Sequence, residues 1–293
     1  MRLNDTVLVL VVVLIWGVSF TVIKVGLAEL PPFLFSALRF AVVASLVFLV
    51  PYPRTVSVFN IVLIGLLLGV VKFGLLFTAM DAEIAAGPAA LLLQSQVFFT
   101  LAFGALFFRE YLTRQQIFGV GVALLGLFSF VVVSKGAASP LGILLVLLAA
   151  LTWACVNVLM KQIEQKTQLS VIVWASLVPV APLLFLSWCF ETKTLLSSVS
   201  ELSANGWLAV LYMGLLATLA FAAWGKLLSK YSAVSVTPYA LLIPIFGIVS
   251  SRLFLGERSD LLESAAMAII LIGLAVCLLP SSNRPKSSKT CGH

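Results

Sequence analysis

Long apolar segments, separated by short polar connections, run through almost the whole chain. Of its 293 residues 62% belong to the set AVILMFWYC and only 10% are charged, whereas a soluble domain is about 45–50% apolar and about 25% charged. A membrane-spanning helix takes roughly 20 residues, so the chain has room for about nine or ten. This excludes a large soluble domain, a nucleic-acid-binding module and a disordered chain.

The apolar segments predict ten spans. No cleavage site follows the first one, which is too long for a signal peptide, so we expect it to be retained. A polar tail at 281–293 is expected to be disordered. The expected spans cover residues 6–27, 33–50, 59–79, 88–108, 115–134, 140–161, 169–189, 206–228, 233–254 and 261–280.

The distribution of Lys and Arg predicts the orientation, because cytoplasmic loops carry the excess of these residues. With a cytoplasmic N-terminus, eleven of them lie inside and at most six outside, counting Lys24, Arg39 and Arg252 at outer span ends. Lys72 is then the single charge deep in the membrane. We therefore expect a multi-pass membrane protein with both termini in the cytoplasm.

Two ordered blocks repeat along the chain. Residues 16–24 (WGVSFTVIK) align with 153–161 (WACVNVLMK), and residues 107–110 (FFRE) align with 254–257 (FLGE). Each copy contains five expected spans, and five is odd, so the second copy enters the membrane from the opposite face. Inverted repeats of this kind are common in transporters that open one central site alternately to either side.

Several chemistries are excluded by composition. The one histidine is His293, the last residue, and the four cysteines form no CxxC pair. We therefore expect no catalytic residues, no metal site and no cofactor, and no nucleic-acid partner.

The repeated blocks give the first candidate binding residues. Trp16 and Phe20 lie one turn apart on one face of the first span, and Trp153 and Asn157 do so in the sixth. Both tryptophans lie near mid-bilayer, which favours the walls of a central cavity over interfacial anchors. Asn157 is open to two interpretations, substrate contact or a tie between helices.

Three further polar residues lie inside spans. Lys72 is near the midplane, where it would attract a carboxylate-bearing substrate or respond to protonation. The alternative is that a tilted helix lets it reach the interface by snorkelling. Gln94 and Gln96 are two residues apart and are expected to point to nearly opposite faces. Of the two, Gln94 is the preferred cavity residue.

The acidic residues all fall in loops or at span ends. Proton-driven carriers usually place a titratable group in the transport path, so coupling to protons and downhill transport both stay open. Pro238 and Pro244 interrupt the ninth span, as Pro179 and Pro182 interrupt the seventh. Pro238 with Tyr239, and Trp224, would form a gate, and static kinks are the alternative.

The ordered motifs resemble the drug/metabolite transporter superfamily, specifically its EamA-like exporter family. The resemblance covers residues 6–280, and one departure is Lys72, where the pattern is glutamine-like. The residues on which this resemblance rests are Trp16-Gly17, Phe20, Ile23 to Gly26, Pro31-Pro32, Leu38 to Phe40, Gly87 to Gln96, Glu110, Trp153 to Asn157, Lys161, Trp224-Gly225, Tyr231, Pro238 to Pro244 and Glu257.

The resemblance implies an all-α integral membrane fold of ten helices in two inverted five-helix repeats, at 6–134 and 140–280. It also implies a central cavity. Helical periodicity, without the resemblance, predicts only Trp16 and Trp153 as residues that line this cavity. The residues it places there are Trp16, Phe20, Lys72, Gln94, Asn157, Trp224 and Tyr239.

The resemblance implies an inner-membrane exporter of small amino-acid metabolites, similar to cysteine and O-acetylserine. The inverted repeat predicts that it works by alternating access in the lipid bilayer. An exporter of drugs or other metabolites is the alternative within the same class. An intramembrane enzyme or a structural membrane subunit is the remote alternative.

Overall fold

The computed structural model describes residues 2–108, 113–133, 138–191, 199–230, 239–240, 242–258 and 260–278. These residues form helices throughout, apart from turns and an isolated bridge between Ile84 and Ala138. The predicted tail at 281–293 and the proposed gate residue Pro238 lie outside the described residues.

The helices of the first half follow the expected spans. Within the described residues, five helical segments are long and apolar enough to cross a membrane. The first is α1, whose 25 residues reach about 37 Å at 1.5 Å per residue. The first half consists of α1 (Leu3–Leu27), α2 (Pro32–Ala44) with η1 (Ser45–Phe48), α3 (Val58–Gly65), η2 (Leu66–Phe73), α4 (Gly74–Thr78), η3 (Ala79–Glu83), α5 (Ala86–Leu92), η4 (Leu93–Ser95), α6 (Gln96–Phe108) and α7 (Arg114–Val133).

The second half repeats this order. Its seventh span is broken as the prolines predict, because α9 ends at Ala175 and Pro179 precedes α10. The elements are α8 (Pro140–Lys161), η5 (Gln165–Thr167), α9 (Gln168–Ala175), α10 (Val180–Phe190), α12 (Ala204–Leu211), η6 (Tyr212–Leu216), α13 (Ala217–Lys230), α15 (Leu242–Leu255) and α16 (Leu261–Leu278).

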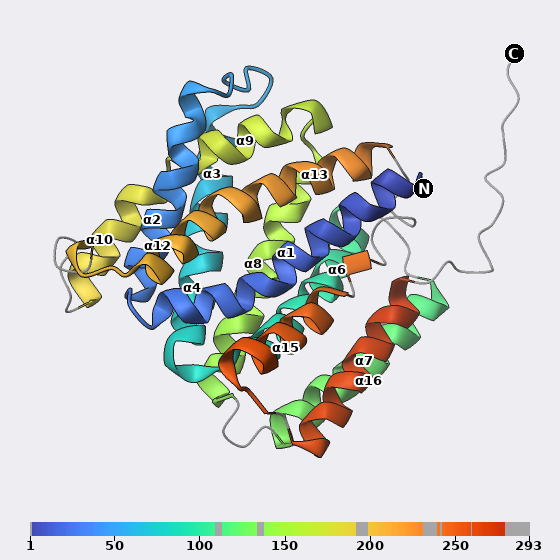
Figure 1. Ribbon diagram of the computed structural model, residues 1–293. Coiled ribbons are helices and arrows are strands. Elements are labelled where there is room, and N and C mark those ends of the chain that lie inside the picture. The colour runs from blue at the N-terminus through green and yellow to red at the C-terminus, as the bar shows by residue number, and fades with distance from the viewer. Residues whose placement is uncertain are drawn as a thin grey trace, which may run out of the picture.

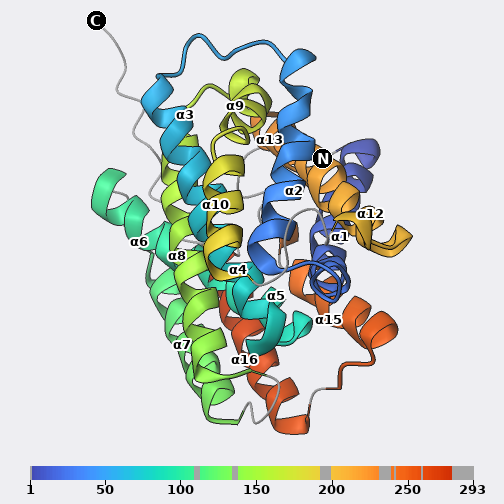
Figure 2. The same cartoon turned by 90° about the vertical axis from the view of Figure 1, so that its left-hand side faces the viewer.

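The packing partners are exchanged between the halves. Helix α1 packs against α15 and α13, whereas α8, which carries the matching tryptophan, packs against α6 and η2. The two last helices, α7 and α16, pack along each other at one edge of the bundle (Figures 1 and 2). The end of α1 lies beside η3, where Lys24 Nζ approaches the carbonyl of Asp81 at 3.4 Å, and η3 contacts the start of α8 through Glu83 and Ser139. Helix α1 therefore ends at the face where α8 begins, so the two copies run in opposite directions.

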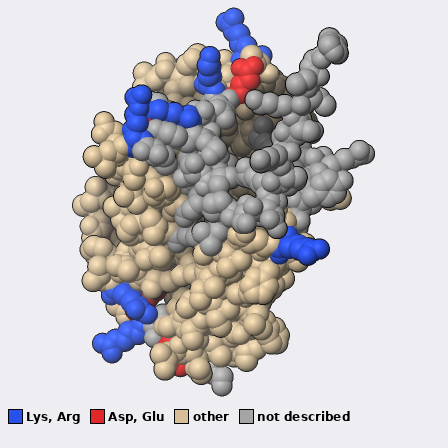
Figure 3. Space-filling model, turned by 90° about the vertical axis from the view of Figure 1, so that its right-hand side faces the viewer, with Lys and Arg blue, Asp and Glu red and all other residues tan. Residues whose placement is uncertain are grey.

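The outer surface has the composition that a bilayer requires. Large apolar side chains such as Phe48, Phe128 and Trp188 are exposed, and exposed apolar surface on this scale marks contact with lipid. On the face drawn in Figure 3, most Lys and Arg side chains lie toward the upper and lower ends, and uncharged side chains cover most of the described surface between them. This arrangement suits a multi-pass membrane protein.

Candidate functional site

Four aromatic side chains form a continuous row at the centre of the bundle. The Phe221 ring lies between the two repeated tryptophans, with its centroid 4.8 Å from that of Trp16 and 5.1 Å from that of Trp153. Trp224 extends the row, 5.3 Å from Trp16. The sequence brings Trp16 and Trp153 together as a matched pair, and the structure joins them through a residue that sequence reasoning missed.

The backbone between α12 and α13 positions this row. The π-helical turn η6 precedes α13, and such turns redirect side chains and are frequent at functional sites. Tyr212 in this turn donates its hydroxyl to the carbonyl of Ile15 at 2.8 Å, and the indole Nε1 of Trp16 donates to the carbonyl of Ala217 at 3.4 Å. These two contacts fix α1 against η6 and α13.

Lys72 faces the interior of the bundle. Its side chain is only 5% exposed, and its ammonium lies 3.3 Å from the ring centre of Phe73 and 4.5 Å from that of Trp153. A cation over an aromatic face is attracted by the ring quadrupole. The geometry favours the interior interpretation of Lys72 over snorkelling, and it brings Lys72 beside the aromatic row.

Arg39 is a second charged residue that lies deep in the bundle. We expected it at an outer span end, but it lies in the middle of the helical segment Pro32–Phe48 and is 3% exposed. Its guanidinium stacks on Phe73, with Cζ 3.8 Å from the ring centre, and lies 4.6 Å from the ring of Phe40. The prediction that Lys72 is the single deep charge is therefore wrong. The rings of Phe40 and Phe73 enclose the guanidinium, so ring stacking replaces water around its charge.

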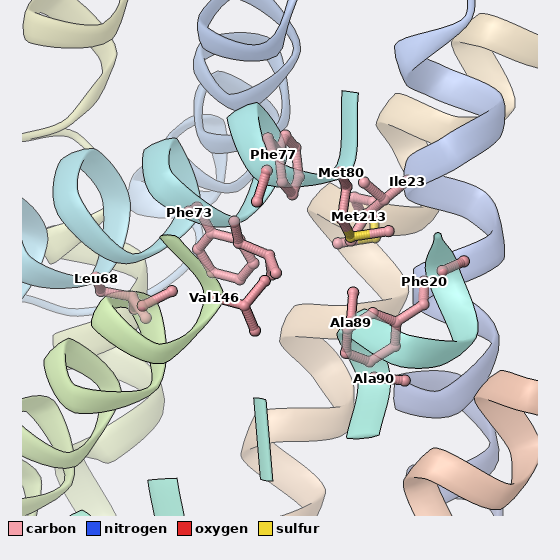
Figure 4. Close-up of a cluster of buried hydrophobic side chains, with 14 of the residues drawn as sticks. Phe20, Ile23, Leu68, Phe73, Phe77, Met80, Ala89, Ala90, Val146 and Met213 are labelled. Carbon is pink, nitrogen blue, oxygen red and sulfur yellow. The ribbon is translucent and has the colours of Figure 1, made fainter. Parts of the chain in front are cut away.

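Phe73 itself belongs to the main buried core. Its ring lies in the cluster drawn in Figure 4, near Phe77 and Val146, and packs edge to face with Phe77 at 5.6 Å. The ring that holds both cations is therefore fixed in place by the surrounding helices.

The two glutamines and Asn157 make ties between helices or turns. Gln94 is buried and donates to the carbonyl of Ala240 at 3.0 Å, and Gln96 donates to the side chain of Gln94 at 3.1 Å. The expectation that these glutamines point to opposite faces is wrong, because residues 93–95 form a tighter 3₁₀ turn. Asn157 donates to the hydroxyl of Thr100 at 3.4 Å.

The remaining predicted residues lie in the packing of α1, α13 and α15. Phe20 is buried in the core beside Ala89 and Ala90 (Figure 4), so it packs α1 against α5. Tyr239 packs with Trp224 against the buried pair Val9 and Leu227. Pro244 is buried in the first turn of α15.

Carboxylates close one face of the bundle by capping helices of the opposite half. Glu191, which follows α10, accepts from the amides of Phe33 at 2.5 Å and Leu34 at 3.2 Å, in the first turn of α2. Glu257, which follows α15, accepts from the amides of Ala86 at 2.8 Å and Gly87 at 3.1 Å, at the start of α5. The first-turn amides of a helix have no partner within it and favour a negative charge.

Two first-half carboxylates cap second-half helices in return. Glu29, which follows α1, accepts from the amide of Ser203 at 2.8 Å and from its hydroxyl at 2.6 Å, at the start of α12. Glu83 accepts from the hydroxyl of Ser139, the residue before α8, and its carbonyl accepts from the amide of Ser139 at 2.7 Å. We call Glu29, Glu83, Glu191 and Glu257 the carboxylate caps.

The pKa of one carboxylate cap, Glu29, is shifted from its ordinary value. The hydrogen bonds from Ser203 lower the pKa of Glu29 from its ordinary value, because they favour its ionised form. A cavity of about 510 Å³ lies at this same face, and its lining includes Glu29, Asp81, Glu191 and Pro31. The face therefore has an acidic entrance whose walls come from both halves.

The opposite face is joined by a salt bridge. Lys230 at the end of α13 lies 2.7 Å from the carboxylate of Asp5 at the start of α1. In the part of the chain that the structure describes, no group of three or more His, Cys, Asp or Glu side chains could hold a metal ion.

Sequence reasoning missed Phe221, the position of Arg39 and the carboxylate caps. Each cap joins residues 56 to 174 positions apart, so no local pattern reveals it. The one available signal was the alignment of Glu257 with Glu110 in the repeated sequence block.

Comparisons with known proteins agree with this architecture. The EamA-like transporter family matches residues 6–132 and 140–279. A "Probable amino-acid metabolite efflux pump" of Salmonella typhimurium strain LT2 is 36% identical over 285 residues, covering 94% of this chain and 95% of that protein. A protein of the same name from Escherichia coli strain K12 is 34% identical over 286 residues, with 94% and 95% covered.

Two more distant proteins share the fold or the family. The "Uncharacterized inner membrane transporter YedA" of Escherichia coli strain K12 is 27% identical, covering 91% of this chain and 88% of its own. A solved structure, named only "Crystal structure of protein", has a TM-score of 0.65 and 19% identity, covering 94% of this chain and 96% of its own. With matches over both halves and 36% identity along nearly the whole length, the chain belongs to the EamA-like transporter family, whose fold is ten helices in two inverted repeats.

Proposed function

We propose that this transporter exports small amino-acid metabolites, of the size and chemistry of cysteine and O-acetylserine, through alternating access to the central aromatic row. The observation that supports this most is the row itself, in which Phe221 joins the matched tryptophans Trp16 and Trp153. The names of the two relatives at 34–36% identity point to the same substrate class.

The proposed site suits a small zwitterion. Aromatic rings bind the apolar part of a ligand, and a few fixed polar groups orient it. Around the row these polar groups are Lys72, Gln94 and Asn157, which lie on η2, η4 and α8. Trp224 and Tyr239 would close the row toward the face where α1 begins.

The carboxylate caps supply the first gate. They connect helix ends of one repeat to helix starts of the other, so the repeats cannot separate at this face while the caps are in place. Opening the face would break the caps and expose the cavity to the row, whereas the opposite face would open by separation of Lys230 from Asp5.

The proposed topology places the carboxylate caps outside. The Lys and Arg distribution sets both termini in the cytoplasm, in the inner membrane in which YedA is named. Substrate would then enter while the outer caps are closed and leave when they break. Protons are a candidate coupling ion at the caps, because protonation removes the charge that the helix starts favour. The repeats at 6–134 and 140–280 would be the moving units.

Export in cells tests this proposal. Overproduction of the protein in a bacterium is expected to raise tolerance to excess cysteine and to lower the intracellular level of labelled O-acetylserine. The variant Phe221→Ala is expected to lose both effects, whereas Phe48→Ala, which changes an aromatic residue that is 91% exposed, keeps them. Equal intracellular levels with and without the protein would refute amino-acid export.

A further inference from the structure

Among the described residues, Arg39 finds no acceptor for some of its N–H groups. Its Nε and Nη1 atoms are buried and have no hydrogen-bond partner in that part of the chain. One turn earlier on the same face of α2, the hydroxyl of Ser36 is also buried and has no partner among the described residues. Ring stacking stabilises the charge of the guanidinium, but it leaves these donors unsatisfied. Buried donors of a charged group are costly to leave without an acceptor.

Lys72 places a second positive charge against the ring that Arg39 stacks on, Phe73. The ammonium of Lys72 and the guanidinium of Arg39 both lie within 4 Å of the centre of the Phe73 ring. Among the described residues neither side chain forms a salt bridge, and the charge that acts on Lys72 is that of Arg39 itself. Two like charges held together in a low-dielectric interior repel each other. An anion would remove both the repulsion and the unsatisfied donors.

We propose that Arg39 and Lys72 form one anion site, and that it binds the carboxylate of the exported metabolite. A guanidinium presents its N–H groups in a planar fork that matches the two oxygens of a carboxylate, and Ser36 supplies a third donor. The ring of Trp153 contacts the Lys72 ammonium and the ring of Phe221, so it connects the two cations to the aromatic row. A ligand held at its carboxylate by Arg39 and Lys72 therefore extends its side chain along the aromatic row.

This inference rests on the proposed function, because it names the group by which the substrate is held. It makes Arg39 a binding residue alongside Lys72. It also sets the substrate class, since amino acids whose own carboxyl group is blocked as an ester or an amide lack the required anion.

Thermal unfolding of the purified full-length protein, with sodium acetate as the probe, tests the site without assuming any transport. Acetate is the smallest carboxylate of this kind, and acetamide is its neutral counterpart of similar shape. We expect acetate to raise the unfolding temperature of the native protein and acetamide to leave it unchanged, since a ligand that binds the folded state stabilises it.

The variants Arg39→Gln and Lys72→Gln are expected to need about tenfold more acetate, or more, for the same stabilisation, the magnitude of one lost hydrogen bond to a charged group. Arg54→Gln is the matched control, because Arg54 is exposed in a loop. Arg39→Lys keeps the charge without the fork, so it serves where Arg39→Gln does not fold and is also expected to bind acetate more weakly.

Three results would overturn the proposal. One is equal stabilisation by acetate and acetamide, and another is an acetate response of Arg39→Gln and Lys72→Gln that equals that of Arg54→Gln. Sodium chloride acting as strongly as acetate at equal concentration would make the site a halide site and remove the carboxylate assignment.

Counterflow of labelled O-acetylserine in liposomes separates this proposal from the proposed function. Flux that persists unchanged in Arg39→Gln and Lys72→Gln would refute the carboxylate site and leave amino-acid export intact. No flux with the native protein, together with a specific acetate response, would refute amino-acid export and leave an anion site for another carboxylate.

Discussion

The substitution Glu257→Gln tests whether the carboxylate caps hold their face closed. Glu257 accepts two backbone hydrogen bonds at the start of α5, from Ala86 and Gly87. Glutamine has one acceptor oxygen and no charge, so it loses at least one charge-assisted bond, worth about 1.5–3 kcal/mol. Because Glu257 is half-buried, the low end applies, and the weaker interaction with the helix start adds about 0.3–1 kcal/mol.

The loss of about 2 kcal/mol should appear as faster amide exchange at the start of α5. Since about 1.4 kcal/mol corresponds to a factor of ten, the amides of Ala86 and Gly87 should exchange roughly 30-fold faster in Glu257→Gln. Hydrogen–deuterium exchange of the purified protein, followed by mass spectrometry of the peptide over 84–92, measures this directly.

Glu201→Gln is the control for this experiment, because Glu201 is an exposed carboxylate that precedes the start of α12. It removes the same charge and should leave exchange at Ala86 and Gly87 unchanged. Native exchange rates at these amides in Glu257→Gln would refute the view that the cap holds the helix start.

Three further predictions concern packing, the aromatic row and pH. A Cβ added at Gly17 would lie 2.5 Å from Phe246 Cβ and 2.8 Å from the carbonyl of Ile243, so Gly17→Ala should lower stability by about 1–3 kcal/mol in thermal unfolding. Gly121→Ala, whose Cβ meets nothing within 4 Å, should not, and equal losses would contradict the close approach of α1 and α15. Phe221→Leu keeps bulk but removes the ring, so it should weaken binding of labelled O-acetylserine, measured by counterflow; unchanged counterflow would remove Phe221 from the site. Because the pKa of Glu29 is lowered in the folded state, its cap should persist above the ordinary carboxyl pKa and be lost as pH falls through the lowered value. Exchange of the amide of Ser203 against pH would show this, and Glu29→Gln should abolish the dependence.

The fold was predictable because its signals are local. Apolar segments of about 20 residues define spans, and the repeated Trp16 and Trp153 blocks with five spans each define the inversion. Bilayer physics leaves helices as the available structure for such segments. The break before α10, at Pro179, follows from the same local chemistry.

The site was predictable only in part, because it depends on contacts between distant segments. Position within a span suggests the depth of Lys72. Arg39 was misplaced because its burial depends on stacking against Phe73, which lies on a different helix. The neighbours of Trp16 on α13 follow from the turn η6, and no periodicity in the sequence reports a π-helical turn. The prediction that Gln94 and Gln96 point to opposite faces was wrong for the same reason, because no periodicity in the sequence indicates the 3₁₀ turn η4.

Counterflow in liposomes that contain the purified protein tests the central claim most directly. Liposomes loaded with unlabelled O-acetylserine should accumulate labelled O-acetylserine and cysteine from outside, and Trp153→Ala should reduce this accumulation to the level of protein-free liposomes. Trp188→Ala, which changes a tryptophan that is 79% exposed, should accumulate label like the native protein. Absence of counterflow for every amino-acid metabolite, with the protein folded and inserted, would contradict amino-acid export through the central aromatic row.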